Sequence, residues 1–126
     1  MKSATKKVLI IEDSPHLAES LKDMLELQDI EAIIATSGED GIEMAESNSP
    51  DLTLLDIRLP GIDGYEVFRQ IKSSLWGKDL DVIILTASES IEAVAKNLGL
   101  QQTEVLFKPE WSMRELLTFV SNRLKL

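Results

Sequence analysis

The chain has 126 residues, of which 44% are hydrophobic and 28% charged, a balance typical of a single soluble globular domain. With 13 Lys and Arg against 22 Asp and Glu, its net charge is −9, which argues against direct binding of nucleic-acid phosphates. The sequence has no cysteine, which excludes disulfides and thiolate metal sites, and no apolar run approaches the roughly 20 residues of a membrane span.

Short apolar runs alternate along the chain with longer amphipathic segments. The first run, residues 8–11, is apolar at every position, as expected for a strand covered on both faces. Ser14 is the predicted N-cap of the helix that follows, with Pro15 at its first position. The later runs predict strands over 30–35, 52–55, 82–85 and 104–107. The later amphipathic segments predict helices over 41–47, 65–75 and 89–98, and a last helix capped by Ser112.

This regular alternation of strand and helix predicts an α/β fold, in which helices cover both faces of a parallel sheet. Sheets of this kind carry their functional side chains at the carboxyl ends of the strands. The residues at those ends are Glu12, Asp13, Asp56, Thr86 and Lys108. If the first strand is central and the third is its neighbour, three carboxylates meet at one edge of the sheet, with a lysine and a threonine facing them.

Three clustered carboxylates repel one another, and a divalent cation that prefers oxygen ligands, such as Mg²⁺, relieves this repulsion. The chemistry favoured by such a site is aspartyl phosphorylation. Asp56 would be the nucleophile that forms an acyl phosphate. Lys108 would supply a positive charge to one phosphoryl oxygen, and the Thr86 hydroxyl could reach another.

The same residues also allow purely structural roles. Glu12 and Asp13 could stabilise the start of the first helix through its dipole. Lys108 could form a structural ion pair with Asp56. The hydroxyl of Thr86, or that of Ser88 two residues later, could cap the fourth helix.

Four segments together resemble the receiver domain of two-component response regulators. They are residues 8–14, 51–66, 84–87 and 107–109. The resemblance covers essentially the whole chain, and it implies a single receiver domain over 1–126 with a core at about 7–124. It also implies a flavodoxin-like fold, a doubly wound five-stranded parallel sheet in the order 2-1-3-4-5 with five helices.

The resemblance assigns the phosphoryl acceptor and the metal ligands. Asp56 would take a phosphoryl group from a phosphohistidine on a sensor histidine kinase or a phosphotransfer protein. Mg²⁺ would be held by Glu12, Asp13, Asp56 and the backbone carbonyl of Arg58. The side chain of Arg58 would overhang the site, where it would either bind the phosphoryl group or hinder an attacking water.

The resemblance implies further roles. Thr86 would be the switch hydroxyl that moves toward the phosphoryl group, Lys108 would be the family's lysine, and the peptide bond before Pro109 would be cis. The domain would be a cytoplasmic phosphoacceptor and not an enzyme in the usual sense. It would signal to an output domain or target protein through the surface of the fourth helix, fifth strand and fifth helix, the same surface that would form a homodimer.

The sequence departs from the family at Val105 and in residues 98–103, which lack the usual Gly-Ala turn before the fifth strand. Three other functions compete with the receiver. Val105 stands three residues before the lysine, where receivers usually carry Tyr or Phe, so a pseudo-receiver that binds partners without phosphorylation is the alternative function.

A haloacid-dehalogenase phosphatase would need an Asp at the position of Arg58. A flavin or dinucleotide protein would need a Gly-rich or Ser/Thr-rich loop in place of Glu12 and Asp13.

Overall fold

The strands form one parallel sheet. In the computed structural model, which describes residues 5–125, they lie in the order β2-β1-β3-β4-β5. Their bounds are β1 (Lys7–Ile11), β2 (Glu31–Ala35), β3 (Leu52–Asp56), β4 (Val82–Thr86) and β5 (Val105–Phe107). The predicted flavodoxin-like order is therefore confirmed, while residues 1–4 and 126 of the predicted domain lie outside the described residues.

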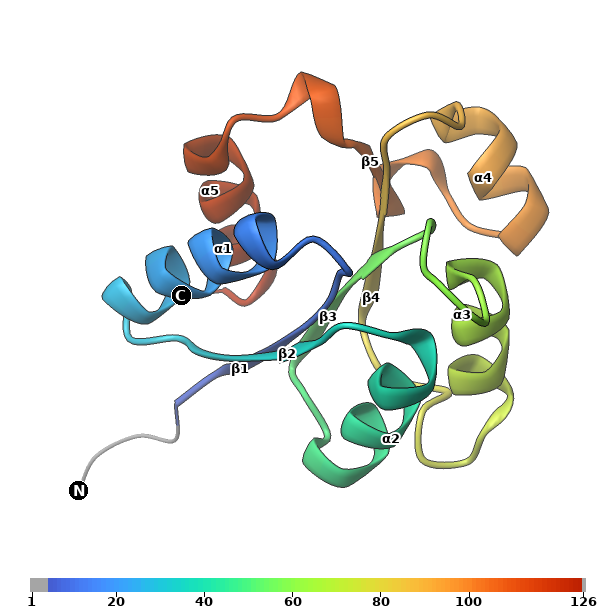
Figure 1. Ribbon diagram of the computed structural model, residues 1–126, viewed down its shortest axis with the longest axis horizontal. Helices are drawn as coiled ribbons and strands as arrows, with labels where there is room; N and C mark the ends of the chain where they lie inside the picture. Colours follow the sequence, from blue (N-terminus) through green and yellow to red (C-terminus); the bar gives the residue numbers. More distant parts are fainter. Residues whose placement is uncertain (1–4, 126) are drawn as a thin grey trace.

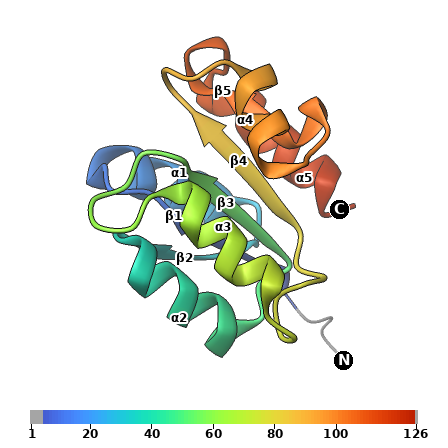
Figure 2. The same cartoon turned by 90° about the vertical axis from the view of Figure 1, so that its right-hand side faces the viewer.

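Helices cover both faces of the sheet. Their bounds are α1 (Pro15–Leu27), α2 (Gly38–Asn48), α3 (Gly64–Ser73), α4 (Ile91–Leu98) and α5 (Met113–Arg123). Figure 1 shows α1 and α5 on one face of the sheet, and Figure 2 shows α2, α3 and α4 on the other. Among the described residues, no helix combines the length and the apolar character that crossing a bilayer requires.

The sheet separates two hydrophobic cores. Successive side chains of a strand point to opposite faces, so Val8 and Ile10 of β1 pack under α1 and α5, while Leu9 and Ile11 pack under the other three helices. All four side chains are buried. This two-sided burial explains why the first apolar run shows no alternation in the sequence.

The strand register brings the functional ends together. Ile11 of β1 pairs with Leu55 of β3, and Asp56 of β3 pairs with Leu85 of β4. Because the strands are parallel, the residues that follow β1, β3 and β4 emerge at the same edge of the sheet.

The start of α3 lies directly against this edge, and a glycine makes the approach possible. The Gly64 amide donates a hydrogen bond to the carbonyl of Ile57 at 2.9 Å. A Cβ atom at position 64 would lie 2.5 Å from both the Asp56 carbonyl oxygen and the Ile57 Cα. Only glycine fits this contact without a backbone shift.

Helices α2 and α4 begin at other residues than the sequence pattern predicts, because other side chains cap them. Helix α2 begins at Gly38 and not at 41, since the Ser37 hydroxyl accepts a hydrogen bond from the Asp40 amide. Helix α4 begins at Ile91 and not at 89, since Ser90 is its N-cap. The suggestion that Thr86 or Ser88 caps α4 is therefore wrong.

Candidate functional site

Three carboxylates meet at the carboxyl edge of the sheet, as predicted. Glu12 and Asp13 follow β1, and Asp56 is the last residue of β3. Each offers a carboxylate oxygen within 4.8 Å of the other two. Glu12 and Asp56 are buried, whereas Asp13 is exposed, so the cluster opens to solvent on the side of Asp13.

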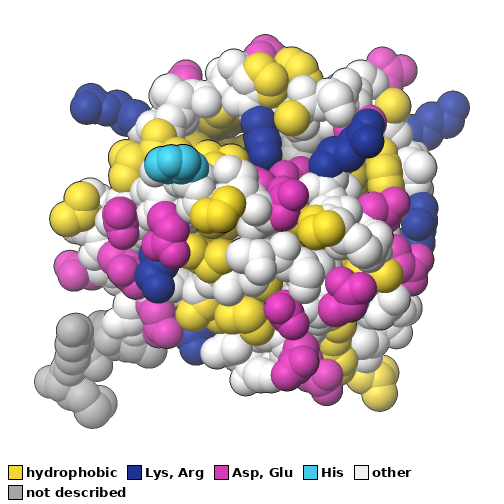
Figure 3. Space-filling view, viewed as in Figure 1, with side chains coloured by type: hydrophobic (Ala, Val, Ile, Leu, Met, Phe, Trp, Pro, Cys, Tyr) yellow, Lys and Arg dark blue, Asp and Glu magenta, His cyan; other side chains and the backbone are white. Residues whose placement is uncertain are grey.

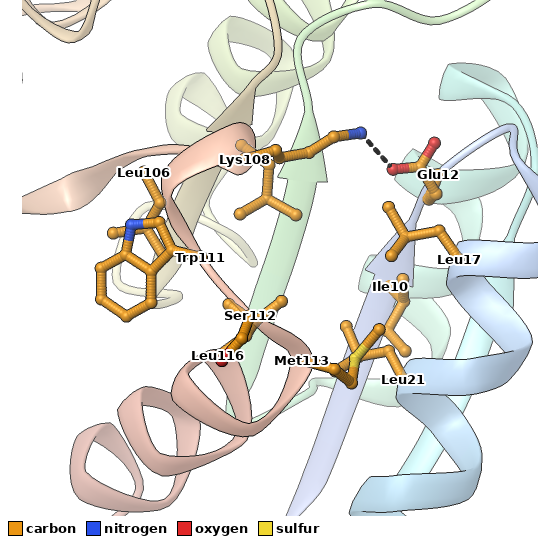
Figure 4. Close-up of a pocket in the computed structure, with 11 residues that line it drawn as sticks. Ile10, Glu12, Leu17, Leu21, Leu106, Lys108, Trp111, Ser112, Met113 and Leu116 are labelled. Atoms are coloured by element: carbon orange, nitrogen blue, oxygen red, sulfur yellow. Dashed lines mark hydrogen bonds and ion pairs between the residues drawn. The ribbon is translucent and has the colours of Figure 1, made fainter.

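Lys108 reaches into this cluster from the end of β5. Its Nζ donates to Glu12 Oε1 at 2.9 Å and to Asp56 Oδ2 at 3.1 Å. Figure 4 shows the Lys108 side chain extended toward Glu12, above the apolar side chains of Ile10 and Leu17. A small, mostly apolar cavity of about 60 Å³ lies beneath the ion pair, between α1 and α5. The ion pair between Lys108 and Asp56 that the sequence allowed is thus present.

The charges in the cluster perturb each other. Burial, reinforced by the negative charge of Asp56 and opposed by the hydrogen bond from Lys108, raises the pKa of Glu12 to about 7. Burial alone would lower the pKa of Lys108, but its contacts with Glu12 and Asp56 outweigh burial and raise it. With three carboxylates and one ammonium group, the site has an excess of negative charge that suits a divalent cation. In the view of Figure 3, acidic side chains lie near the centre of the molecule, with basic side chains close above them.

The oxygens of Asp56 are held in place by two donors. Oδ1 accepts a hydrogen bond from the backbone amide of Arg58 at 2.9 Å, and Oδ2 accepts from Lys108. Both contacts fix the orientation of the carboxylate. A carboxylate held in one orientation is suited to act as a nucleophile.

Thr86 is the last residue of β4, beside Asp56. Its hydroxyl forms hydrogen bonds with Glu89, a residue that the sequence did not single out. Thr86 Oγ1 donates to the Glu89 carbonyl oxygen at 3.0 Å and accepts from the Glu89 amide at 3.1 Å. The Glu89 carboxylate also forms an ion pair with the Arg58 guanidinium, with Glu89 Oε1 and Arg58 Nη2 2.7 Å apart. In the sequence, Glu89 appears only as a residue of the expected fourth helix, and nothing there signals its pairing with Arg58.

An open cleft of about 480 Å³ adjoins the carboxylates. Asp13, Arg58 and Glu89 border it together with Tyr65, and the loop after β3 forms its floor. Burial and the negative charges of Glu89 and Asp63 raise the pKa of Tyr65. The cleft opens to solvent beside Asp13, the exposed member of the cluster.

Val105 is buried, and it pairs with Ile84 in the sheet. Phe107, two residues on, is only half-buried and lines a second surface hollow with Ser90, the N-cap of α4, and Ile91, its first residue. An aromatic side chain therefore lies next to the start of α4, although not at the position where receivers usually carry one.

The predicted cis peptide bond before Pro109 is wrong. No cis peptide bond occurs in the described part of the chain. Residues Lys108–Glu110 instead form a 3₁₀ turn, closed by a hydrogen bond of 3.1 Å from the Trp111 amide to the Lys108 carbonyl. A trans proline in the first turn suits this geometry, because its fixed φ matches the helical value.

A flavodoxin-like sheet that gathers three carboxylates and a lysine at its carboxyl edge defines the class of signalling phosphoacceptor domains. The family model of the response regulator receiver domain matches residues 8–121. The chain belongs to this family and hence to two-component signal transduction. It is a signalling phosphoacceptor domain and not a conventional enzyme.

Relatives of known sequence and structure agree with this assignment. The response regulator MprA of Mycobacterium ulcerans (strain Agy99) is 33% identical over 111 residues, which are 88% of this chain and 47% of that protein. The chain thus spans about half the length of the curated relatives it matches.

Two solved receivers match nearly the whole chain. A CheY-like receiver domain protein from Methanospirillum hungatei JF-1 superposes with a TM-score of 0.82 at 26% identity, covering 97% of this chain and 95% of its own. The receiver domain of a sensor histidine kinase from Pseudomonas aeruginosa PAO1 has a TM-score of 0.81 at 25% identity, covering 98% and 100%, and coordinates a magnesium ion in its active-site cleft.

Proposed function

We propose that Asp56 is the phosphoacceptor of this receiver and that phosphorylation requires Mg²⁺. The observation that carries the proposal is the contact of Lys108 Nζ with both Asp56 and Glu12 inside the three-carboxylate cluster. A buried carboxylate with one lysine partner and two acidic neighbours is suited to accept a phosphoryl group together with a cation.

The carboxylate of Asp56 attacks the phosphorus of a phosphohistidine. The new O–P bond forms as the P–N bond breaks, and its electron pair goes to the departing imidazole nitrogen. Lys108 stays close to Asp56 and supplies positive charge to a phosphoryl oxygen, while the Thr86 hydroxyl turns toward another. The Arg58 amide holds Asp56 Oδ1 so that the carboxylate keeps its orientation.

The carboxylates of Glu12, Asp13 and Asp56, with the backbone carbonyl of Arg58, are the proposed ligands of Mg²⁺. Their oxygen chemistry fits the ion, and the three side chains already lie within 4.8 Å of one another. When bound, Mg²⁺ neutralises the oxygens of the phosphoryl group. The likeness to the Pseudomonas receiver, which coordinates magnesium, supports this choice of cation.

The finer assignments form part of the same proposal. A sensor histidine kinase or phosphotransfer protein donates the phosphoryl group in the cytoplasm, and residues 7–124 act as one receiver domain. The signal leaves through the surface of α4, β5 and α5, which receives an output domain or target protein or pairs with a second copy. The half-buried Phe107 beside α4 supports this choice of surface.

A pseudo-receiver remains the second candidate, because the buried Val105 occupies the usual aromatic position. Incubation with acetyl phosphate or phosphoramidate and Mg²⁺ separates the two. The proposal predicts a gain of one phosphoryl mass that is lost in Asp56→Asn and retained in Asp79→Asn, a control at an exposed aspartate. Unchanged mass in the unsubstituted protein would leave only the pseudo-receiver.

A further inference from the structure

Glu89 contacts two residues that flank the phosphorylation site. Its carboxylate Oε1 lies 2.7 Å from the Arg58 guanidinium, and its Oε2 accepts from Ser88 Oγ at 3.0 Å and from Thr86 Oγ1 at 3.3 Å. Its backbone amide and carbonyl also bond the Thr86 hydroxyl. One residue thus holds a guanidinium and a buried hydroxyl at the same time.

The residues that carry both groups lie close to Asp56 in the fold. Thr86 follows Leu85, which is the register partner of Asp56 in the neighbouring strand. Arg58 is two residues past Asp56 and borders the same cleft as Glu89. A phosphoryl group on Asp56 would bring strong acceptor oxygens and additional negative charge within range of both.

The two groups cannot serve Glu89 and a phosphoryl group equally well. The hydroxyl of Thr86 has one proton, and in this structure that proton is directed at Glu89. The Arg58 side chain is 69% exposed, so its ion pair with Glu89 is weakly held by its surroundings and can exchange. Partner exchange is therefore physically accessible at both contacts.

We propose that Glu89 is a positioning residue that latches Thr86 and Arg58 away from Asp56 in the unphosphorylated protein. The latch rests on the proposed phosphorylation of Asp56. Phosphorylation transfers both groups from Glu89 to the phosphoryl oxygens, which releases the segment from Thr86 to Ser90 that leads into α4. The strength of the Glu89 contacts then sets how tightly a phosphoryl group is bound.

The test is a titration with beryllofluoride in the presence of Mg²⁺, with binding followed by calorimetry. Glu89→Gln should bind about fivefold more tightly than the unsubstituted protein, because the resting contacts that oppose binding are weaker. Glu92→Gln makes the same chemical change at an exposed position in the first turn of α4 and should bind like the unsubstituted protein.

A double-mutant cycle shows whether Glu89 acts through Arg58. Arg58→Gln removes one arm of the latch, so adding Glu89→Gln in that background should tighten binding less than twofold. Equal gains in both backgrounds would mean that Glu89 acts only by its charge, and the latch would be wrong. If Glu89→Gln lowers the thermal stability but does not bind beryllofluoride more tightly, Glu89 has only a structural role and the latch is wrong.

The two proposals fail differently. If the unsubstituted protein does not bind beryllofluoride, phosphorylation of Asp56 and the latch are both overturned. If it binds and Glu89→Gln binds with the same affinity, the latch alone is overturned.

Discussion

The ammonium group of Lys108 lies 3.1 Å from Asp56 Oδ2, so the proposed phosphoacceptor is paired with a cation before any phosphoryl group arrives. Lys108 also lies 2.9 Å from Glu12 Oε1. The two carboxylates come from different strands, and the lysine connects both to the end of β5. The neutralisation of both carboxylates therefore depends on the same side chain.

Removal of Lys108 should expose this dependence. In Lys108→Ala, two buried carboxylates lose their cation, and we expect the free energy of unfolding to fall by about 3 kcal/mol in metal-free buffer. Added Mg²⁺ should restore part of this loss, because the cation neutralises the same carboxylates. Urea unfolding with EDTA and with Mg²⁺ measures both effects. A stability equal to that of the unsubstituted protein in EDTA would contradict the role given to Lys108.

Glu12 should make the stability depend on pH. Its pKa rises from the ordinary value of 4.5 to about 7, so the folded protein holds the proton more tightly than the unfolded chain. The protonation of Glu12 therefore stabilises the folded protein. This stabilisation is fully present below pH 4.5 and is lost as the pH rises through about 7. The loss should be on the order of 3 kcal/mol.

Unfolding measured in EDTA between pH 5 and pH 8 tests this expectation. Glu12→Gln should flatten the profile over this range, whereas Glu19→Gln, an exposed control on α1, should leave it unchanged. Since Mg²⁺ binds the ionised carboxylate, its affinity for the unsubstituted protein should rise over the same range. A profile that is equally steep with and without Glu12 would exclude this residue as the source.

The buried hydroxyl of Thr53 forms no hydrogen bond with the described residues. Thr53 lies in β3 with no exposed surface. Thr53→Val replaces the hydroxyl by a methyl group of similar size and should stabilise the protein by about 1 kcal/mol. Thr53→Ser keeps the hydroxyl, removes a methyl group and should destabilise it. Thermal unfolding of both variants checks the signs, and a destabilised valine variant would indicate an unrecognised partner for the hydroxyl.

Gly64 controls the geometry of Asp56 through the backbone. In Gly64→Ala, the new Cβ would lie 2.5 Å from the Asp56 carbonyl oxygen, so the end of β3 or the start of α3 must shift. We expect a loss of about 2 kcal/mol in stability and slower phosphorylation by acetyl phosphate. Gly99→Ala is the matched control, because its φ of 69° strains the backbone while open space surrounds the new Cβ. It should lose stability and keep the phosphorylation rate. Equal rates in all three proteins would show that Asp56 tolerates the displacement.

Much of the fold was predictable from local patterns. The apolar run 8–11 and its later counterparts identify strands, because a strand covered on both faces has no polar alternation. The strand order came from the resemblance to receivers and was confirmed by the register of β1 with β2 and β3. Glu12, Asp13 and Asp56 were identified because a parallel sheet collects the carboxyl ends of its strands at one edge.

The sequence by itself thus determined the elements, their class and the residues at the strand ends, since these follow from periodicity and from position along the chain. Only the tertiary structure decided which of those residues touch. In the tertiary structure Lys108 lies between Glu12 and Asp56, and Ser90 is the N-cap of α4. The peptide bond before Pro109 is trans. The tertiary structure also joined Glu89 to Arg58, which are 31 positions apart in the sequence. Such contacts depend on side-chain reach and loop path, which no local pattern encodes.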